Sequence, residues 1–502
     1  MVAHVNTATV VGLEAEVVDV EADVTNGLPA TVIVGLPDAA VQESKERVRS
    51  ALKNSELKYP QTRVSVNLAP ADTQKIGTQF DVPIALAILL ASEQCAFNVK
   101  NRWFVGELSL DGTLRAVQGV LAIALKAKQM GVAEIYVPLA NGQEAALVEG
   151  ISVYPCPTLS SLVGHLLGME ALMCLPTTTM ASVFKAGHSW LDMAEISGQE
   201  MAKRALEIAS SGGHNVLMSG PPGSGKTLLA RALSGILPDM ELSESLELTK
   251  IYSIAGQLPT SGVVSIRPVR SPHHTTSSVA LVGGGAGPKP GEITLAHRGI
   301  LFMDELPEFP RSALEALRQP LEDGVVTVSR AKNTFTFPAK FILVAALNPC
   351  PCGYYGDSGK RCVCTPAQIF KYQKRLSGPL LDRIDLHIEV PRLSYDKISK
   401  HESQESSQVI RLRVQKARQA QYKRLGGAKT NSEMNVVDIR AHCVLGKEEN
   451  ELLAGATQKY NLSGRSIHRL LKVARTIADL ENSESITQKH IAEALQYRPK
   501  QD

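Results

Sequence analysis

The sequence predicts a multidomain protein of the α/β class. At 502 residues the chain is longer than one ordinary hydrophobic core, so two or three domains are expected. Strand and helix patterns alternate over most of its length, and only helical patterns follow residue 392. A break rich in Pro and Thr at 173–188 interrupts the alternation. We therefore expect domains over 1–170, 191–392 and 393–502, with a linker over 171–190.

Composition is that of a globular protein, with 44% hydrophobic and 21% charged residues. The net charge of +3 is small for this length, so it neither demands nor excludes a nucleic-acid partner. The first residues lack a basic stretch followed by an apolar core, and no apolar run is long enough to span a bilayer. A cytoplasmic protein without a membrane partner is expected.

The first region mixes the two kinds of pattern. Val-rich alternation predicts strands, whereas helical spacing of apolar residues or an unbroken apolar run predicts helices. Strands are expected over 7–24, 62–70 and 133–138, helices over 38–55, 81–92 and 119–131, and a hairpin over 103–119 that turns at Asp111-Gly112. An α+β domain is therefore expected at the N-terminus.

A phosphate-binding loop is predicted at Gly220–Thr227, between the apolar run Val216–Met218 and a helical pattern. The spacing G-x-x-x-x-G-K-[ST] is met in the strand–loop–helix context that the motif requires. Its residues are Gly220, Pro221, Pro222, Gly223, Ser224, Gly225, Lys226 and Thr227. Backbone N–H groups would surround the phosphates of ATP, Lys226 would reach the β- and γ-phosphates, and Thr227 would bind Mg²⁺.

Two further strands are predicted to end in polar residues beside this loop. Ile300–Met303 is followed by Asp304 and Glu305. Asp304 would hold Mg²⁺ through water, and Glu305 would polarise the attacking water. Another buried strand ends in Asn348, which would orient that water or sense the γ-phosphate. A simple turn residue before Pro349 is the alternative for Asn348.

Four of the eight cysteines are grouped within fifteen residues, as Cys350, Cys352, Cys362 and Cys364. Thiolates grouped in this way suit a tetrahedral zinc ion, although C-x-C is tighter than the usual C-x₂-C spacing. Structural Zn²⁺ is the expected occupant, and four reduced thiols are the alternative.

The order of these motifs resembles the AAA+ series of Walker A, Walker B, sensor 1, arginine finger and sensor 2, with Arg383 and Arg465 in the last two positions. The segments SPHHTTSSVALVGGG, PKPGEITLAHRGILFMDELPEF and NPCPCGYYGD closely resemble the ComM/YifB family of magnesium-chelatase-like ATPases over essentially the whole chain. The resemblance implies an AAA+ core, a C-terminal helical lid and a homo-hexamer.

In such a ring Arg383 would stabilise the transferring phosphoryl group in the neighbouring subunit. A surface ion pair with Asp382 or Asp385 is the alternative for Arg383. Arg465 would report the nucleotide state to the helical lid, with Arg469, one turn further along, as the alternative candidate.

The N-terminal region resembles the proteolytic domain of Lon, notably in FVGELSLDGTLRAVQGVLAIALKA. Lon-type proteases use a Ser–Lys pair, but alignment places Gln79 and Leu121 at those positions. Gln79 cannot be activated as a nucleophile and Leu121 cannot act as a base. The domain is therefore expected to lack peptidase activity.

DNA contacts are expected at a hairpin before sensor 1, whose tip carries Arg330 and Lys332. In the resembling family this hairpin faces the pore of the ring, where cations would follow the phosphate backbone. A Gly/Pro loop with the cation Lys289 resembles a second pore-facing insertion. The segment 411–429, with seven basic residues and no acid, is either a further DNA surface or a solvated helix face.

Three functions remain in competition. The resemblance implies an ATP-driven DNA motor with helicase or branch-migration activity on recombination intermediates during natural transformation, acting on single-stranded or branched DNA. A chelatase-type motor acting on a protein or porphyrin partner is the alternative. An ATP-dependent protease is disfavoured by Gln79 and Leu121.

Overall fold

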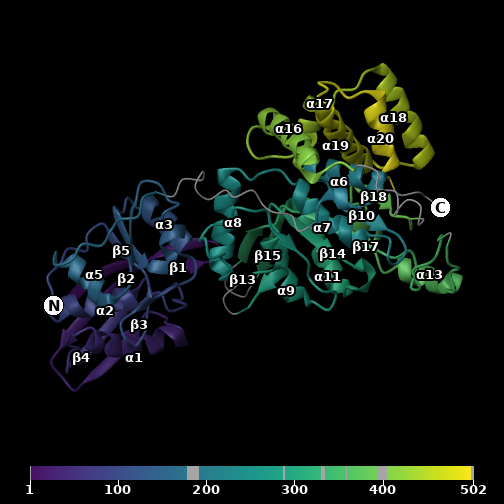
Figure 1. The fold of residues 1–502 in the computed structure, drawn as a ribbon. Coiled ribbons are helices and arrows are strands. Elements are labelled where there is room, and N and C mark those ends of the chain that lie inside the picture. The colour runs from purple at the N-terminus through teal and green to yellow at the C-terminus, as the bar shows by residue number, and fades with distance from the viewer. Residues whose placement is uncertain are drawn as a thin grey trace. The chain divides into compact units, whose positions relative to one another are not determined.

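The computed structural model describes residues 2–177, 191–285, 289–329, 334–357, 359–393 and 404–498. The chain forms two compact units, which are coloured by residue number in Figure 1. Unit 1 comprises Met1–Phe184, Ser245–Ser265 and Gly285–Lys289, and unit 2 comprises Lys185–Glu244, Ile266–Gly284 and Pro290–Asp502. Two segments from the expected range 191–392 thus pack with the N-terminal unit.

Unit 1 contains a four-stranded mixed sheet and a three-stranded parallel sheet. The first has the order β1 (Val2–Val11), β2 (Glu14–Thr25), β4 (Arg63–Ala69), β3 (Ala30–Val34), and only the β3–β4 pair is parallel. The second has the order β5 (Arg102–Phe104), β8 (Glu134–Pro138), β9 (Ser152–Cys156). The predicted strand segments are confirmed, and Gly12, at φ 65°, makes the turn between β1 and β2.

The predicted helices of unit 1 are confirmed as α1 (Ala39–Asn54), α2 (Asp81–Ala91) and α3 (Val120–Gln129), and α4 (Gly142–Ala145) and α5 (Leu159–Leu166) follow. Nearly every residue of α2 is buried, because this apolar helix packs against β1 and β2 at the centre of the core. The predicted hairpin is confirmed only in its central part, β6 (Glu107–Leu108) and β7 (Leu114–Arg115), since residues 102–104 pair with β8 instead.

Most of helix α8 (Leu242–Ala255) belongs to unit 1, and a buried polar contact fixes it there. The Ser253 hydroxyl donates to Glu144 Oε2 at 2.6 Å and accepts the Gly119 N–H at 3.0 Å. Glu144 also accepts the Leu121 N–H at 3.3 Å, so a carboxylate lies at the N-terminal end of α3. Burial raises the pKa of Glu144 above its usual value, although these hydrogen bonds oppose the rise.

Unit 2 is built on a five-stranded sheet in which every pairing is parallel. The strand order is β11 (Val269–Arg270), β14 (Ile300–Met303), β17 (Ile342–Leu347), β10 (Val216–Ser219), β18 (Leu386–Glu389). The central strands are buried, in keeping with their continuous apolar runs. All five strands therefore present their carboxyl ends at one edge of the sheet and their amino ends at the other.

Helices and a hairpin surround this sheet. The helices are α6 (Glu200–Gly212), α7 (Lys226–Ile236), α9 (Ser278–Val282), α10 (Glu292–Leu295), α11 (Arg311–Ala316), α12 (Arg318–Asp323), α13 (Pro366–Gln373) and α14 (Gly378–Leu381). Strands β15 (Val325–Ser329) and β16 (Thr334–Pro338) pair antiparallel, which confirms the predicted hairpin stem. Two-residue strands β12 (Gly283–Gly284) and β13 (Lys289–Pro290) also pair.

Within the described part of 404–498 the regular elements are helices only, as predicted. They are α16 (Ser407–Leu425), the 3₁₀ turn η5 (Asn431–Glu433), α17 (Val436–His442), α18 (Lys447–Tyr460), α19 (Gly464–Leu480) and α20 (Gln488–Gln496). One hydrophobic core joins these helices to α6, α7 and the sheet. Figure 1 shows them gathered on one side of the unit 2 sheet.

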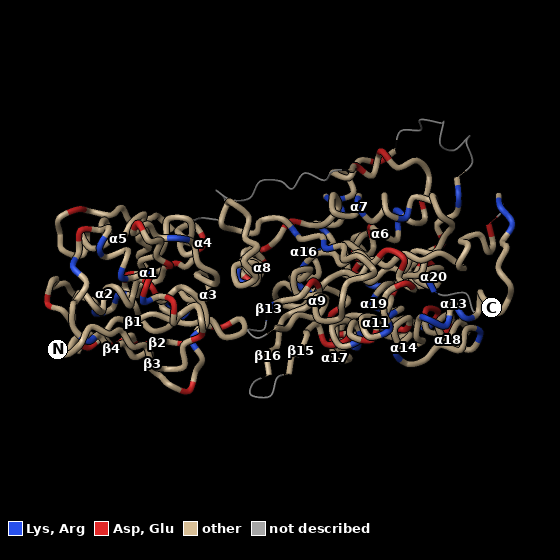
Figure 2. The backbone as a smooth tube through the Cα atoms, turned by 90° about the horizontal axis from the view of Figure 1, so that it is seen from below, with Lys and Arg blue, Asp and Glu red and all other residues tan. Residues whose placement is uncertain are grey.

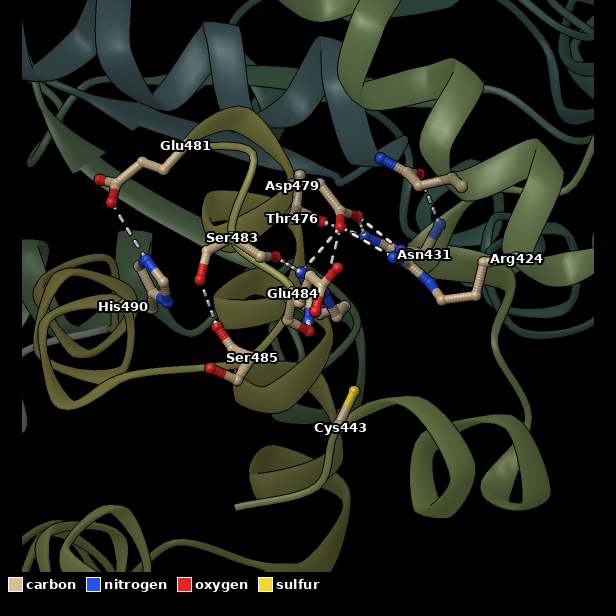
Figure 3. A network of polar contacts seen from close by, with 12 residues as sticks. Arg424, Asn431, Cys443, Thr476, Asp479, Glu481, Ser483, Glu484, Ser485 and His490 are labelled. Atoms are coloured by element: carbon tan, nitrogen blue, oxygen red, sulfur yellow. Dashed lines mark hydrogen bonds and ion pairs between the residues drawn. The ribbon is translucent and has the colours of Figure 1, made fainter. Parts of the chain in front are cut away.

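A buried polar network centred on Asp479 of α19 fixes these helices to one another (Figure 3). Its carboxylate accepts two hydrogen bonds from Arg424 of α16, at 2.8 and 2.5 Å, and one from Arg475 at 3.1 Å. The amide of Asn431 in η5 donates to Asp479 at 2.8 Å and to Thr476 at 3.0 Å. Three elements therefore share one carboxylate that is almost fully buried.

The network predicts a large stability effect. We expect Asp479→Ala to lower the free energy of unfolding of unit 2 by about 3–5 kcal/mol, because two buried guanidinium groups lose their counter-charge. Glu481→Ala is the matched control, since this half-exposed carboxylate pairs with His490 on the rim of the helical region, and its loss should cost less than about 1 kcal/mol. Urea unfolding followed by circular dichroism measures both, and equal losses would contradict the assignment.

Candidate active site

The predicted phosphate loop connects β10 to α7 at the carboxyl edge of the unit 2 sheet. Gly223 and Gly225 have φ angles of 77° and 94°, a region that favours glycine. A Cβ atom at Gly220 would lie 2.2 Å from the Val390 carbonyl oxygen, so this position also requires glycine. The loop therefore requires glycine at two of these positions for their backbone conformation and at the third because there is no room for a side chain.

Lys226 occupies the centre of the loop. Its Nζ donates to the carbonyl oxygens of Gly220 and Pro221 at 2.7 and 2.9 Å, and to Asn348 Oδ1 at 3.3 Å. Burial lowers the pKa of Lys226, and the charges of Asp304 and Glu305 oppose this. The structure thus brings the tip of β17 and the phosphate loop together around one amine.

The predicted magnesium ligands are also adjacent. Thr227 Oγ1 donates to Asp304 Oδ2 at 3.0 Å, so the hydroxyl and the carboxylate face the same point between α7 and β14. These oxygen ligands fit Mg²⁺, which prefers one or two carboxylates together with phosphate oxygens. Glu305 follows with φ 51° and ψ 47°, a left-handed conformation that costs a non-glycine residue strain and is typical of functional sites.

His274, which the sequence interpretation did not assign, lies at the same site. Its Nδ1 is 3.6 Å from Glu305 Oε2, and its ring lies against that of His273, with centroids 4.1 Å apart and the planes tilted by 34°. The histidine pair follows β11 after Ser271 and Pro272, in the segment SPHHTTSSVALVGGG that resembles the family. The two adjacent histidines are visible in the sequence. Their contact with Glu305 is not, because it depends on β11 and β14 being neighbours in the sheet.

A cavity of about 1520 Å³ adjoins the loop. It is lined by the ends of β10, β17 and β18 together with Gly198, Gln199 and the α18–α19 turn around Leu462. Gln199, at φ 59°, donates to the carbonyl oxygens of Ser224 and Pro391 at 3.3 and 2.8 Å. This cavity has the place and size for the base and ribose of a nucleotide whose phosphates occupy the loop.

Arg383 and Arg465 lie at the opposite edge of the sheet. Arg383 Nη2 and Arg465 Nη2 are 2.6 and 3.3 Å from the two carboxylate oxygens of Glu322 in α12. Both arginines line a cavity of about 540 Å³ with residues at the amino ends of four strands, namely Asn215, Gly299, Ile342 and Asp385. The phosphate loop follows the carboxyl end of β10, so neither arginine faces the nucleotide site of its own chain.

A chain of buried contacts ties Arg383 to helix α19. Asn215 donates its amide to the Arg383 carbonyl oxygen at 3.3 Å and its backbone N–H to Asp385 at 3.2 Å. His214, which is fully buried, lies 3.4 Å from Asp385 and 2.8 Å from Thr476 Oγ1. Burial acts to raise the pKa of Asp385, but His214, Arg469 and the backbone N–H of Asn215 together outweigh it and lower this pKa. Through Thr476 the chain reaches the network of Figure 3.

The four grouped cysteines come together in space. Their sulfur atoms all lie within 4.8 Å of one another, and three of the pairs are 3.4 to 3.6 Å apart. A tetrahedral zinc ion with Zn–S bonds of about 2.3 Å separates its sulfurs by about 3.8 Å. The backbone N–H of Tyr355 also donates to Cys350 Sγ at 3.3 Å, a hydrogen bond of the kind that orients thiolates bound to a metal. The cluster therefore fits a zinc site.

The residues proposed to contact DNA are only partly described. Arg330 and Lys332, which come between β15 and β16 in the sequence, lie outside the described residues. Lys289 is exposed, with its Nζ 3.4 Å from Gln118 Oε1.

The basic segment 411–429 is largely engaged within the protein. Arg411 and Arg424 pair with Asp239 and Asp479, and Lys429 pairs with Asp438. Arg413 pairs with Glu207 and Glu405, and Arg418 is buried against the carbonyl oxygens of Ser210 and Ser211. Most of these cations stabilise unit 2, which disfavours a DNA surface here.

In the parts of the chain that the structure describes, no helix combines the length and apolar character needed to cross a membrane.

Comparison with known proteins covers the whole chain. The family model described as magnesium chelatase, subunit ChlI matches residues 192–398, that for subunit ChlI of Mg-chelatase matches 20–141, and that for its C-terminal region matches 404–498. The competence protein ComM of Haemophilus influenzae is 46% identical over 97% of this chain and 95% of its own length. The uncharacterized proteins YifB of Escherichia coli and Rv2897c of Mycobacterium tuberculosis are 44% and 42% identical, over 98% and 97% of this chain and 96% of their own lengths each. The chain belongs to the ComM/YifB family of magnesium-chelatase-like AAA+ proteins.

Proposed function

We propose that this protein is an ATP-driven motor that works as a homo-hexameric ring and remodels DNA. The observation that carries the proposal is the division of the catalytic residues between the two edges of one parallel sheet. Lys226, Thr227, Asp304 and Asn348 meet at the carboxyl edge, whereas Arg383 and Arg465 lie at the amino edge. A chain with this arrangement completes its site only with a neighbouring copy.

Each residue has a role in this scheme. The loop Gly220–Thr227 binds the phosphates of ATP, and Thr227 and Asp304 would hold Mg²⁺, which would neutralise negative charge on those phosphates. Glu305 accepts a proton from the attacking water, which Asn348 orients. Arg383 stabilises the transferring phosphoryl group of the adjacent subunit, Arg465 reports the nucleotide state to the helical lid, and the cavity beside Gln199 holds the base.

DNA enters the proposal through the comparisons and the hairpin. The relative from Haemophilus influenzae is named a competence protein, which supports a role with DNA taken up during natural transformation. The stem β15–β16 precedes Asn348 in the sequence, and residues 330–333 between its two strands, which lie outside the described residues, are where the family resemblance implies pore contacts. We propose helicase or branch-migration activity on single-stranded or branched DNA, with Arg330, Lys332 and Lys289 contacting phosphates.

The N-terminal unit is proposed to be a Lon-like domain without peptidase activity. Gln79 is buried and donates its amide to the Ile76 carbonyl oxygen at 2.8 Å, and Leu121 is fully buried in the core. A role in assembly or DNA contact follows. The helical region 393–502 is proposed to act as the lid, with 171–190 as the linker between the first two domains.

A chelatase-type motor acting on a protein or porphyrin partner is the second candidate. It is favoured by the matches to family models of magnesium chelatase subunit ChlI over three parts of the chain. The effect of DNA on ATP hydrolysis separates the two candidates.

We expect single-stranded or forked DNA to stimulate ATP hydrolysis severalfold, because a DNA motor couples ATP hydrolysis to DNA binding. Lys226→Ala should abolish both the basal and the stimulated rates, and Glu305→Gln should retain ATP binding while lowering kcat by at least about 100-fold. Phosphate release and binding of a fluorescent ATP analogue measure these quantities. An ATPase indifferent to all DNA at low salt would move the proposal to the second candidate.

We also propose that Cys350, Cys352, Cys362 and Cys364 hold a structural Zn²⁺. Purified protein should contain about one zinc per chain, released on titration of the thiols and detected with a colorimetric chelator. Cys352→Ser should lower the zinc content, whereas Cys443→Ser, which changes a buried cysteine of unit 2 outside the cluster, should not. Zinc-free wild-type protein with four reactive thiols at these positions would refute the site.

A further inference from the structure

The segment from Cys350 to Arg375, termed the knuckle lobe, carries exposed aromatic and apolar side chains. Aromatic residues make up 5% of the chain, yet four of these 26 residues are aromatic, namely Tyr354, Tyr355, Phe370 and Tyr372. Tyr355 is 50% exposed, Phe370 59% and Val363 82%. Large apolar side chains grouped on a surface mark an interaction site.

The knuckle lobe is also basic. It has five cations, Lys360, Arg361, Lys371, Lys374 and Arg375, against one acid, Asp357. Arg375 pairs with Glu308 at 2.6 Å, and within the described residues none of the other four cations forms an ion pair. Figure 2 shows Lys and Arg positions, in blue, on the backbone near the α13 label.

Cations and rings lie together in the knuckle lobe. Lys374 Nζ is 4.3 Å from the ring centroid of Phe370, and Lys360 Nζ is 5.1 Å from that of Tyr354. A phosphate bound by either lysine would therefore place its attached base within reach of an aromatic face. Alternation of this kind is how proteins hold single strands without reading sequence.

The exposed rings are held on a fixed support. Tyr372, 7% exposed, anchors α13, and Thr365 caps the helix in a reciprocal pair of contacts with Gln368. The cysteine cluster closes the loop before this helix. Figure 1 shows α13 standing out from the sheet of unit 2, so its exposed face is accessible.

The knuckle lobe also contacts the phosphate loop. A Cβ atom at Gly353 would lie 2.5 Å from Pro222 Cδ, which means that the backbone of the lobe packs directly on this proline. The lobe begins two residues after Asn348. A ligand bound there therefore adjoins the groups that bind the γ-phosphate.

We infer that the knuckle lobe binds single-stranded nucleic acid, with phosphates on Lys360, Arg361, Lys371 and Lys374 and bases stacked on Tyr355 and Phe370. Single strands are favoured over a duplex because paired bases do not expose their faces to aromatic side chains. They are favoured over an acidic protein because rings and cations alternate here. The inference deepens the proposed function and rests on it for naming DNA.

The test measures fluorescence anisotropy of labelled (dT)₃₀, (rU)₃₀ and a 30-base-pair duplex with the full chain, without ATP. We expect the double variant Tyr355→Ala/Phe370→Ala to weaken (dT)₃₀ binding by about tenfold or more, and duplex binding by less than about threefold. The control Val437→Ala/Val444→Ala removes two equally exposed apolar side chains elsewhere in unit 2 and should change neither affinity.

The salt dependence of binding by a double lysine variant gives the second readout. Lys371→Ser/Lys374→Ser should reduce the slope of log K against log salt for (dT)₃₀ by about 1.4, because single strands contribute about 0.7 per phosphate contact and two contacts are removed. The control Lys447→Ser/Lys489→Ser removes the same charge and should leave the slope unchanged. Retained binding of an ATP analogue shows that each variant is folded.

The outcomes separate this inference from the proposed function. Loss of (dT)₃₀ or (rU)₃₀ binding in the lobe variants supports the inference even if DNA does not stimulate the wild-type ATPase, and the ratio of the two identifies DNA or RNA. Unchanged affinity in both lobe variants overturns it, even if DNA does stimulate hydrolysis. The inference is also overturned if the lobe variants lose as much affinity for duplex as for (dT)₃₀, or if the control variants lose affinity too. It is overturned as well if the wild type binds neither single strand, or binds only an acidic protein.

Discussion

Parallel pairing of five strands is the constraint on which the rest of unit 2 depends. It places every carboxyl end at one edge and every amino end at the other. Strand β10 has four residues, which span roughly 13 Å at about 3.3 Å per residue, so the two edges are well separated. The phosphate loop follows one edge and Arg383 precedes the other, and it is from this separation that we propose a site shared between two copies.

The helical region couples to this sheet through buried polar groups. His214 joins Thr476 of α19 to Asp385, and Asn215 joins Asp385 to the carbonyl oxygen of Arg383. A buried polar atom without a hydrogen-bond partner costs free energy, so these contacts fix the position of the turn at Arg383 relative to helix α19. The Asp479 network joins α16 and η5 to the same helix. Arg383 and Arg465 both form ion pairs with Glu322.

Much of this arrangement could be predicted from the sequence because its signals are local. The phosphate loop is a contiguous pattern with glycines required at positive φ, and Asp304 directly follows an apolar strand. Strand order, by contrast, depends on long-range pairing, so the contact of His274 with Glu305 was missed. The placement of Arg465 beside Glu322 and the attachment of α8 to unit 1 through Ser253 likewise depend on contacts between distant segments.

The most direct test of the shared site is a mixing experiment between Lys226→Ala and Arg383→Ala. Each variant alone should hydrolyse ATP at least about 1000-fold more slowly than wild type, because one lacks the phosphate contact and the other the transition-state charge. In a mixture, an intact loop from Arg383→Ala adjoins an intact arginine from Lys226→Ala, so measurable activity should return and peak near equal proportions. Mixtures that stay as inactive as the separate variants, at concentrations where mixed rings form, would contradict a site built from two chains.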